Sequence, residues 1–285
     1  MLDAQLMKTV VSAALAEDAP TGDITSTLVI PADAKATAVL AAREPGVFPG
    51  TDVFAAAFTL TDPSVTVELL RADGDTFEAG DELARVTGPA RAVLTGERVG
   101  LNFVQRMSGI ATLTRAYVDA VAGTNAVILD TRKTTPTLRA FERHAVVCGG
   151  GTNHRFSLSD AFMAKDNHLA VLTEGGLDVT TALREVKAKL PAGMVFEVEV
   201  DRLDQIEPVL AGGVDVIMLD NFSLGDLRTG VDLVAGRAKI EASGGVNLST
   251  VAGIASTGVD YISVGALTHS ARALDLGLDV TISAP

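Results

Sequence analysis

Two adjacent cations follow an apolar run in the segment LDTRKTTP, residues 129–136. Arg132 and Lys133 come just after the acid Asp130, and threonines stand on both sides of the pair. A guanidinium matches a carboxylate or phosphate with two parallel hydrogen bonds, and an ammonium adds a compact charge. The segment therefore predicts a site for a small anion.

More cations follow within the next forty residues. His154 and Arg155 lie in a glycine-rich loop, GGGTNHR, and Lys165 ends the next apolar run. The glycines let the loop turn sharply and bring backbone N–H groups near a ligand. We expect Arg155 and Lys165 to join Arg132 and Lys133 at the anion.

Two further arginines in this region have a simpler interpretation. Arg139 and Arg143 fall within PTLRAFERHAV, which has the pattern of a helix. We expect both to lie on the solvated face of that helix, away from the anion.

Acidic side chains occupy one side of a later strand. In FEVEVD, residues 196–201, Glu197 and Glu199 alternate with apolar residues and so point to the same side. Together with Asp220 they could bind Mg²⁺ or accept hydrogen bonds from ribose hydroxyls. Alternatively, they pair with Lys165 or Arg132 in a buried ion network, and the sequence leaves both possibilities open.

Two short glycine turns complete the set of chemically suited residues. SGG (243–245) and VGA (264–266) each close an apolar run and lead toward a predicted helix. Backbone N–H groups at such turns, together with the positive end of a helix dipole, suit a phosphate.

These residues share a position relative to the predicted strands. Short apolar runs alternate with helix-period segments, which is typical of a parallel α/β barrel. The six runs are AVILD (126–130), AFMAKD (161–166), VFEVEVD (195–201), VIMLDN (216–221), KIEASGG (239–245) and YISVGA (261–266). Residues 274–280 are a candidate seventh strand or a terminal helix, so we expect fewer than eight regular strands. In a parallel barrel the carboxyl ends of the strands form one rim, where active sites lie. The run ends that this rim would gather are Asp130, Lys165, Glu199, Asp220, Ser243 and Gly265.

The chain changes character near residue 110. Before it lie short alternating strands such as VTVELL (65–70), and residues 97–122 have helical periodicity. The first eighteen residues predict an amphipathic helix and not a signal peptide.

Composition excludes several classes of protein. The acidic balance argues against a nucleic-acid or anionic-membrane binder, and no apolar run approaches the length of a membrane span. The single cysteine, Cys148, cannot form an internal disulfide and fits a reducing compartment. We therefore expect a soluble cytoplasmic protein.

Taken in order, the motifs resemble the quinolinate phosphoribosyltransferases (nicotinate-nucleotide pyrophosphorylase, carboxylating), and they cover nearly the whole chain. The similar segments are EDAPTGDITS (17–26), GERVGLNFVQRMSGIAT (96–112), DTRKTTP (130–136), GGGTNHR (149–155), KDNH (165–168), EVEVD (197–201), LDN (219–221), SGG (243–245) and VGALTHS (264–270). The resemblance implies an N-terminal α/β sandwich domain, residues 1–109, and an irregular C-terminal α/β barrel, residues 110–285. It also implies a homodimer in which Arg98 is donated to the neighbouring active site. The one mild departure is Gly100, where a larger helix residue is expected.

The resemblance also assigns roles by position. Quinolinate would be held by Arg98, Thr131, Arg132, Lys133, His154, Arg155 and Lys165. Ribose and its Mg²⁺ would be held by Glu199 and Asp220. The 5′-phosphate would be held by Ser243, Gly244, Gly245, Val264, Gly265 and Ala266, with His269 beside them. The catalytic residues would be Lys133, Lys165, Glu199 and Asp220.

The implied reaction joins quinolinate to 5-phosphoribosyl 1-pyrophosphate, and gives nicotinate mononucleotide, pyrophosphate and CO₂ in de novo NAD biosynthesis. Two alternatives stay open. Lys165 could form a Schiff base with a carbonyl substrate, although Asp166 and Glu199 would favour its charged, unreactive form. The chain could instead be a non-catalytic relative of the same fold associated with oxyanion transport. The intact acid pair and the complete set of cations argue against this alternative.

Overall fold

The structure is a computed structural model that describes residues 2–283. It divides into two compact units. The antiparallel unit comprises the chain up to Arg115, residues Thr135–Gly150 and the chain from Ser270. The barrel unit comprises Ala116–Thr134 and Gly151–His269. These compact units interleave along the chain. The division into two domains at residue 109/110 stays a prediction.

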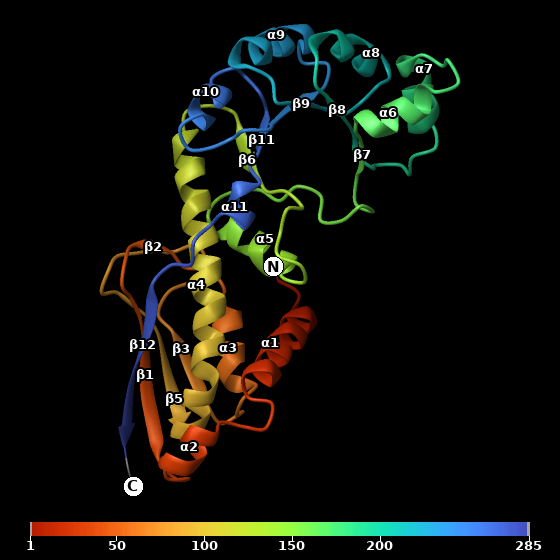
Figure 1. The fold of residues 1–285 in the computed structure, drawn as a ribbon. Coiled ribbons are helices and arrows are strands. Elements are labelled where there is room, and N and C mark those ends of the chain that lie inside the picture. Colours follow the sequence, from red (N-terminus) through yellow and green to blue (C-terminus); the bar gives the residue numbers. More distant parts are fainter. Residues whose placement is uncertain (1, 284–285) are drawn as a thin grey trace. The chain divides into compact units, whose positions relative to one another are not determined.

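The antiparallel unit is built on a four-stranded sheet with the order β12-β1-β5-β3. Its strands are β1 (Lys35–Ala42), β3 (Thr66–Leu69), β5 (Glu82–Pro89) and β12 (Leu276–Ser283), with a separate pair of β2 (Gly46–Val47) and β4 (Thr76–Phe77). Its helices are α1 (Ala4–Asp18), α2 (Ile24–Val29), α3 (Thr51–Thr59), α5 (Arg139–Cys148) and most of α4 (Ala90–Ala120). Helices α1, α3 and α4 cover one face of the sheet (Figure 1), which gives the predicted α/β sandwich.

Local sequence explains where these elements begin and how they pack. Asp3 caps α1 by accepting the N–H of Leu6 at 2.7 Å, as an N-cap side chain should. The core between helix and sheet contains the buried rings of Phe54 and Phe58, whose centroids lie 5.0 Å apart. A Cβ on Gly100 would lie 3.2 Å from the Phe58 ring. Gly100 is therefore a buried packing position, and the expectation of a larger residue there was wrong.

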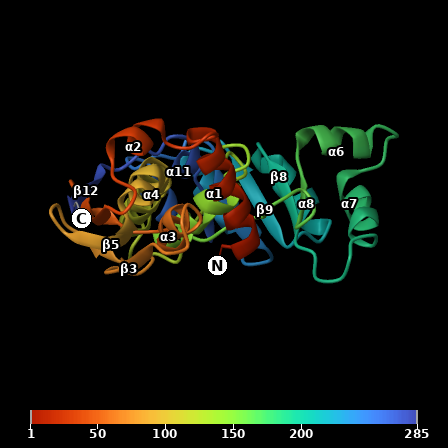
Figure 2. The same ribbon diagram turned by 90° about the horizontal axis from the view of Figure 1, so that it is seen from below.

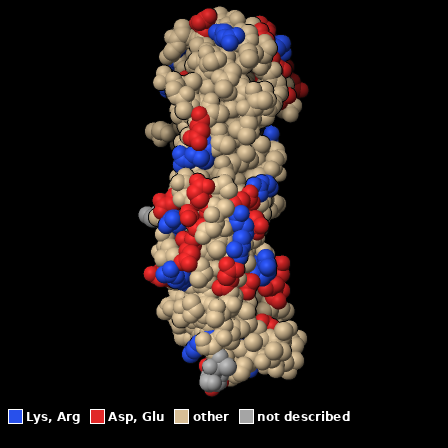
Figure 3. All heavy atoms as spheres, turned by 90° about the vertical axis from the view of Figure 1, so that its left-hand side faces the viewer, with Lys and Arg blue, Asp and Glu red and all other residues tan. Residues whose placement is uncertain are grey.

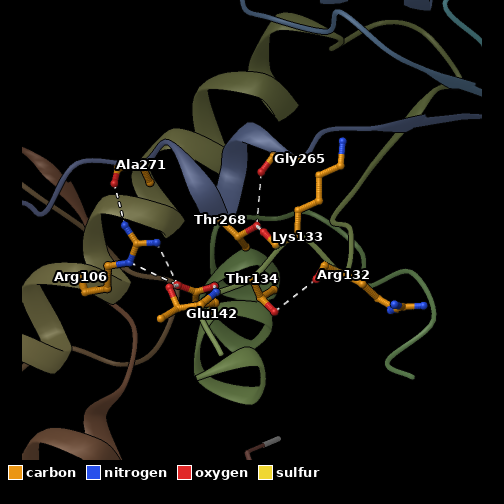
Figure 4. Close-up of polar contacts among 9 residues, drawn as sticks. Arg106, Arg132, Lys133, Thr134, Glu142, Gly265, Thr268 and Ala271 are labelled. Carbon is orange, nitrogen blue, oxygen red and sulfur yellow. Dashed lines mark hydrogen bonds and ion pairs between the residues drawn. The ribbon is translucent and has the colours of Figure 1, made fainter. Parts of the chain in front are cut away.

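Two other expectations for this unit need correction. Of residues 274–280, the last five do form part of a strand, but this strand, β12, pairs antiparallel with β1 and is not a seventh barrel strand. Arg143 does not lie on a solvated face, because it is 7% exposed, whereas Arg139 is of intermediate exposure. Helix α5 buries more of its polar side than its sequence suggests. Glu142 is buried as well, and its carboxylate accepts a hydrogen bond from the guanidinium of Arg106 at 2.9 Å (Figure 4).

Acidic and basic side chains intermingle on the face of the protein shown in Figure 3. The antiparallel sheet carries exposed ion pairs of this kind, such as Arg43–Asp279 and Arg85–Glu82, both at 2.6 Å. Exposed pairs contribute at most about 1 kcal/mol each. The apolar core, and not surface charge, therefore holds this sheet together.

The barrel unit contains a six-stranded sheet with the order β6-β11-β10-β9-β8-β7. All five pairings in it are parallel. The strands are β6 (Val127–Leu129), β7 (Phe162–Ala164), β8 (Phe196–Val200), β9 (Val216–Asp220), β10 (Lys239–Ser243) and β11 (Tyr261–Ser263), so all six predicted runs form strands. Chain order and sheet order agree cyclically, and only a β6–β7 pairing would be needed to close the sheet. The fold is thus the predicted irregular barrel with fewer than eight strands.

Helices connect the strands and lie around the outside of this sheet (Figure 1). They are α6 (Asp166–Thr173), α7 (Val179–Lys187), the 3₁₀ turn Leu203–Gln205, α8 (Ile206–Ala211), α9 (Leu224–Val234), α10 (Val251–Ala255) and α11 (Ala266–His269). Figure 2 shows α6 and α7 next to each other, and they are in contact. Strand β8 is buried along nearly its whole length, as a strand covered on both faces must be. Within residues 2–283, no helix combines the length and apolar character needed to cross a membrane.

Candidate active site

A pocket of about 590 Å³ lies at the carboxyl ends of the barrel strands, and its lining belongs entirely to the barrel unit. Five of the six predicted run ends line it, and Gly265 is the exception. These five are Asp130, Lys165, Glu199, Asp220 and Ser243. The rest of the lining is Thr131, Arg132, Lys133, His154, Arg155, Met163, Met218, Asn221, Glu241, Gly244, Gly245 and Ser263. The lining holds four Lys or Arg and four Asp or Glu side chains, so the pocket pairs a cationic with an anionic surface.

The four cations come from both sides of the open edge between β6 and β7. Arg132 and Lys133 follow β6, Lys165 follows β7, and Arg155 belongs to the segment between these strands. Partial burial and the nearby charge of Arg132 lower the pKa of Arg155. Two guanidinium groups placed this close favour binding of an anion, because the anion relieves their mutual repulsion.

Arg155 is held in position by its own surroundings. Its guanidinium donates to the carbonyl oxygen of Ala161 at 3.2 Å and lies 3.3 Å from the sulfur of Met163. Its backbone nitrogen lies 2.7 Å from Nδ1 of His154. The loop that follows the glycines thus presents both predicted residues of the NHR motif to the pocket.

Lys165 forms an ion pair with Glu199, by contact between Nζ and Oε2. The Lys165 side chain is 45% exposed and that of Glu199 is 16% exposed. This pair matches the ion-network alternative for the acids of β8, but it joins two residues that both line the pocket. It therefore does not remove either from contact with a ligand.

Lys133 is positioned by the turn after β11. Thr268 donates its hydroxyl to the carbonyl oxygen of Lys133 at 2.7 Å (Figure 4). A Cβ on Gly265 would lie 3.1 Å from the Lys133 side chain and 3.0 Å from Nε2 of His269. The absence of a side chain at position 265 thus lets the Lys133 stem and the His269 ring approach the same turn.

The turns after β9 and β10 pack tightly on one another. Asp220 and Ser243 are register partners, and the N–H of Asn221 donates to the carbonyl of Ser243 at 2.9 Å. Gly244 has a φ of +89°, and a Cβ there would lie 2.1 Å from Oδ1 of Asn221. Only glycine fits this position, which keeps backbone exposed at the pocket wall. Residues 246–250 separate the SGG turn from the start of α10.

One histidine and two glutamates form a cluster at the pocket, where His154 and Glu241 belong to the lining and the buried Glu197 does not. Nε2 of His154 lies 3.3 Å from Glu197 and 3.2 Å from Glu241, and the two acids are 2% and 1% exposed. Burial opposes the charged form of His154, but the hydrogen bonds to the two glutamates outweigh it and raise its pKa to about 10. Burial raises the pKa of Glu197. Ser263 donates its hydroxyl to Glu241.

Glu241 was not identified from the sequence as a functional candidate. The signal was present, because KIEAS places one acid inside an apolar run that forms a parallel strand. A buried carboxylate in such a strand needs a partner. Sequence gives no indication that the partner is His154, which lies 87 positions away.

Most residues predicted by resemblance line this pocket, and a few do not. Val264, Gly265, Ala266 and His269 are absent from the lining, although Gly265 and His269 approach Lys133. Arg98 is exposed on α4 in the antiparallel unit and is not part of the lining.

The donor atoms available for a metal suit Mg²⁺. Glu199 and Asp220 offer carboxylate oxygens, the ligands that this hard cation prefers. Two groups of three close metal-ligating side chains occur within residues 2–283, and neither includes Glu199 or Asp220. Such an incomplete set fits Mg²⁺, which typically uses one or two carboxylates together with substrate phosphates.

Comparison with known proteins places this architecture in a family. Residues 110–279 match the model of the quinolinate phosphoribosyl transferase C-terminal domain, and residues 23–108 match that of the N-terminal domain. The chain is 46% identical to the nicotinate-nucleotide pyrophosphorylase [carboxylating] of Mycobacterium leprae, over 94% of each chain. It is 42% identical to the probable nicotinate-nucleotide pyrophosphorylase [carboxylating] of Bacillus subtilis, over 94% of this chain and 91% of the relative.

Solved structures agree with the sequence comparison. The crystal structure of NadC from Streptococcus pyogenes superposes with a TM-score of 0.94 at 42% identity, and covers 100% of this chain and 99% of that one. The nicotinate-nucleotide pyrophosphorylase of Francisella tularensis gives a TM-score of 0.91 at 37% identity, with 99% and 98% covered. The chain therefore belongs to the quinolinate phosphoribosyl transferase family.

Proposed function

We propose that this protein transfers the phosphoribosyl group of 5-phosphoribosyl 1-pyrophosphate to quinolinate, with decarboxylation, in de novo NAD biosynthesis. The products are nicotinate mononucleotide, pyrophosphate and CO₂. The observation that carries the proposal is one pocket with cations along the β6–β7 edge and carboxylates and a glycine turn at β8–β10. A pyridine dicarboxylate suits the first surface, and an activated sugar phosphate suits the second.

The cations would bind quinolinate as its dianion. Arg132 and Arg155 supply planar donors for the two carboxylates, and Thr131 and His154 line the same part of the pocket. Charge-assisted hydrogen bonds of this kind contribute about 1.5–3 kcal/mol each. Repulsion between the two guanidinium groups falls as the dianion enters, which adds to the selectivity for two negative charges.

The acids would hold the sugar and stabilise charge that develops on it. As the bond from C1 of the ribose to pyrophosphate breaks, the ring becomes oxocarbenium-like, and Glu199 favours that positive charge. Asp220 accepts hydrogen bonds from the ribose hydroxyls, and Lys133 lies where the departing pyrophosphate carries negative charge. The Ser243–Gly245 turn presents backbone N–H groups to the 5′-phosphate.

Transfer and decarboxylation are linked by charge on the pyridine ring. The ring nitrogen attacks C1, becomes cationic, and can then accept the electron pair left when the C2 carboxylate departs as CO₂. Lys165, held by Glu199, is the candidate donor of the proton that C2 takes up. This chemistry needs no organic cofactor.

Mg²⁺ is part of the proposal. Glu199 and Asp220 would hold it, and when bound it neutralises charge on the pyrophosphate leaving group. Removal of Mg²⁺ with a chelator should stop product formation, and added Mg²⁺ should restore it. Full turnover in a chelated sample would remove the metal from the proposal.

The functional unit is proposed to be a homodimer in which the partner subunit's Arg98 completes the quinolinate site. Mixing the variants Arg98→Ala and Arg132→Ala tests this, because a mixed dimer contains one site with both arginines. Random exchange of subunits should restore about a quarter of the wild-type activity. If the mixture stays as inactive as its components, Arg98 acts within its own subunit or not at all.

The decisive test of substrate assignment is calorimetry with Arg132→Ala. Its affinity for quinolinate should fall by at least about 100-fold, since two charge-assisted hydrogen bonds are lost, while affinity for 5-phosphoribosyl 1-pyrophosphate stays close to wild type. Arg85→Ala, which removes an exposed guanidinium from the antiparallel sheet, is the matched control. Unchanged quinolinate affinity in Arg132→Ala would refute the assignment.

The assay also separates the alternatives. CO₂ release from quinolinate that depends on 5-phosphoribosyl 1-pyrophosphate supports the transferase. A Schiff-base lyase would instead be trapped on Lys165 by borohydride, and a non-catalytic relative would bind without turnover. The ion pair of Lys165 with Glu199 speaks against the Schiff base, because it engages the nitrogen that would have to attack the carbonyl.

A further inference from the structure

A second group of metal-ligating side chains lies in the antiparallel unit, outside the pocket. His144 and Cys148 are four residues apart on α5 and therefore share one face of that helix. Asp73 reaches them from the turn that precedes β4. Nε2 of His144 lies 2.6 Å from Oδ2 of Asp73 and 3.6 Å from Sγ of Cys148. One ligating atom from each side chain lies within 4.8 Å of the others.

We propose that Asp73, His144 and Cys148 form a binding site for a zinc-class divalent transition metal, with Oδ2, Nε2 and Sγ as ligands and solvent at the fourth position. The site goes beyond the proposed phosphoribosyl transfer and shares no residue with the pocket.

The two distances from Nε2 of His144 fit a tetrahedral site after one small movement. Zn–N and Zn–S bonds of about 2.0–2.3 Å place tetrahedral ligand atoms roughly 3.4–3.6 Å apart. The 3.6 Å separation of Nε2 and Sγ already meets this value. The 2.6 Å between Nε2 and Oδ2 is shorter because a hydrogen bond joins them, and it must open by about 0.8 Å. The Asp73 side chain is 30% exposed, so its carboxylate has room to move.

Nε2 of His144 faces both Asp73 and Cys148. A single proton on this nitrogen can bond to only one of them at a time, whereas a metal ion can bond to both. Asp73 is oriented through its second oxygen, because Oδ1 accepts the N–H of Thr51 at 2.9 Å. Carboxylate ligands fixed by such a hydrogen bond bind metals more tightly.

Ligand type decides which metal the site would take. Thiolate and imidazole favour zinc and its neighbours over Mg²⁺ or Ca²⁺. Two anionic ligands and one neutral imidazole also balance the charge of a divalent ion. The His154–Glu197–Glu241 cluster lacks sulfur, and two of its members line the pocket, so it serves as the internal contrast.

A thiol binds a metal as its thiolate. Metal binding at this site must therefore displace the thiol proton of Cys148 as well as the proton on Nε2 of His144. Binding at neutral pH should release about two protons per metal ion, which can be measured in weakly buffered solution.

Cobalt titration of the full-length protein under a thiol-free reductant tests the site directly. The chain has one cysteine, so any thiolate-to-cobalt charge-transfer absorption must come from Cys148. We expect this absorption to saturate at one Co²⁺ per chain and to be displaced by Zn²⁺. It should vanish in Cys148→Ser and persist in His154→Gln, which alters the other cluster.

Calorimetry with Zn²⁺ gives the second measurement. Affinity should fall at least 100-fold in Cys148→Ser and in His144→Gln, while phosphoribosyl transfer by Cys148→Ser stays at the wild-type rate. Wild-type protein that binds Co²⁺ without charge-transfer absorption, or that shows no binding at micromolar metal, would overturn the proposal. Neither measurement uses quinolinate or 5-phosphoribosyl 1-pyrophosphate, so failure here is distinct from failure of the proposed function.

Discussion

The two histidine clusters of this protein reach the same electrostatic result in different surroundings. His154 lies between two buried glutamates in the barrel unit, and His144 lies between an aspartate and a thiol in the antiparallel unit. In both cases hydrogen-bonded neighbours raise the pKa of the histidine to about 10. The difference is in burial, since Glu197 and Glu241 are almost inaccessible, whereas 30% of the Asp73 side chain is exposed.

This difference in burial determines how strongly each histidine stabilises the acidic groups next to it. Around His154, two acids depend on one cation, because water reaches neither of them freely. Around His144, solvent can take over part of the role of each partner. A buried charge left without its partner costs several times more than an exposed one.

The largest expected effect follows from removing His154. His154→Ala leaves Glu197 and Glu241 as two buried acids without the imidazolium, and should lower the free energy of unfolding by about 3–5 kcal/mol. His144→Ala should lower it by only about 1 kcal/mol, because its partners are partly solvated. Urea unfolding at neutral pH measures both values.

A second substitution sharpens this result. Glu241→Gln in the His154→Ala background removes one of the two acids and should recover part of the lost stability, which a double-mutant cycle would show as coupling. Equal losses for His154→Ala and His144→Ala would mean that burial does not distinguish the clusters.

Substitution of His154 should also lower enzymatic activity more than substitution of His144. His154→Gln retains a polar group but changes its position in the pocket, and should lower kcat/KM by about 100-fold. His144→Gln lies outside the pocket lining and should stay within about twofold of wild type. Steady-state assays with both substrates measure the ratio, and a large loss in His144→Gln would show that the second cluster also supports catalysis.

The dependence of stability on pH provides an intermediate effect. Both histidines have a folded-state pKa of about 10, above the ordinary value of 6.5, so the folded protein binds more protons between these values. Their contribution is fully present below pH 6.5 and is lost as the pH rises through 10. In His144→Gln the loss over this range should be smaller by about 1 kcal/mol, after allowance for solvent screening of a partly exposed group. Identical pH profiles for this variant and wild type would show that His144 is not charged in the folded state.

Sequence periodicity was sufficient to locate the barrel strands and most of the strand ends that line the pocket. The apolar runs are short and bounded by glycine or charge, so each of the six was recognisable as a strand, and parallel topology then required their ends to meet. The destination of residues 274–280 was not predictable in this way. A strand pattern does not encode its pairing partner, and β12 pairs with β1 more than 200 residues away.

The site was predictable where chemistry lies at strand ends, and less so where it lies inside strands. Arg132, Lys165 and Asp220 were identified because charge follows an apolar run. Glu241 looked like a minor interruption of a strand, and Arg143 looked like an ordinary surface residue of a helix. Burial depends on what packs against a residue, and that information is held by distant segments of the chain.

The smallest expected effect concerns Cys148 without metal. Cys148→Ser keeps a small side chain beside His144, and its contact of 3.6 Å is a weak hydrogen bond, so unfolding free energy in chelator should change by less than about 0.5 kcal/mol. With Zn²⁺ present, the wild type should gain stability by mass action and the variant should not, which turns a neutral substitution into a visible one. Thermal unfolding of both proteins with and without Zn²⁺ measures this difference. If the two proteins respond equally to Zn²⁺, the sulfur that distinguishes this cluster from the buried one takes no part in binding.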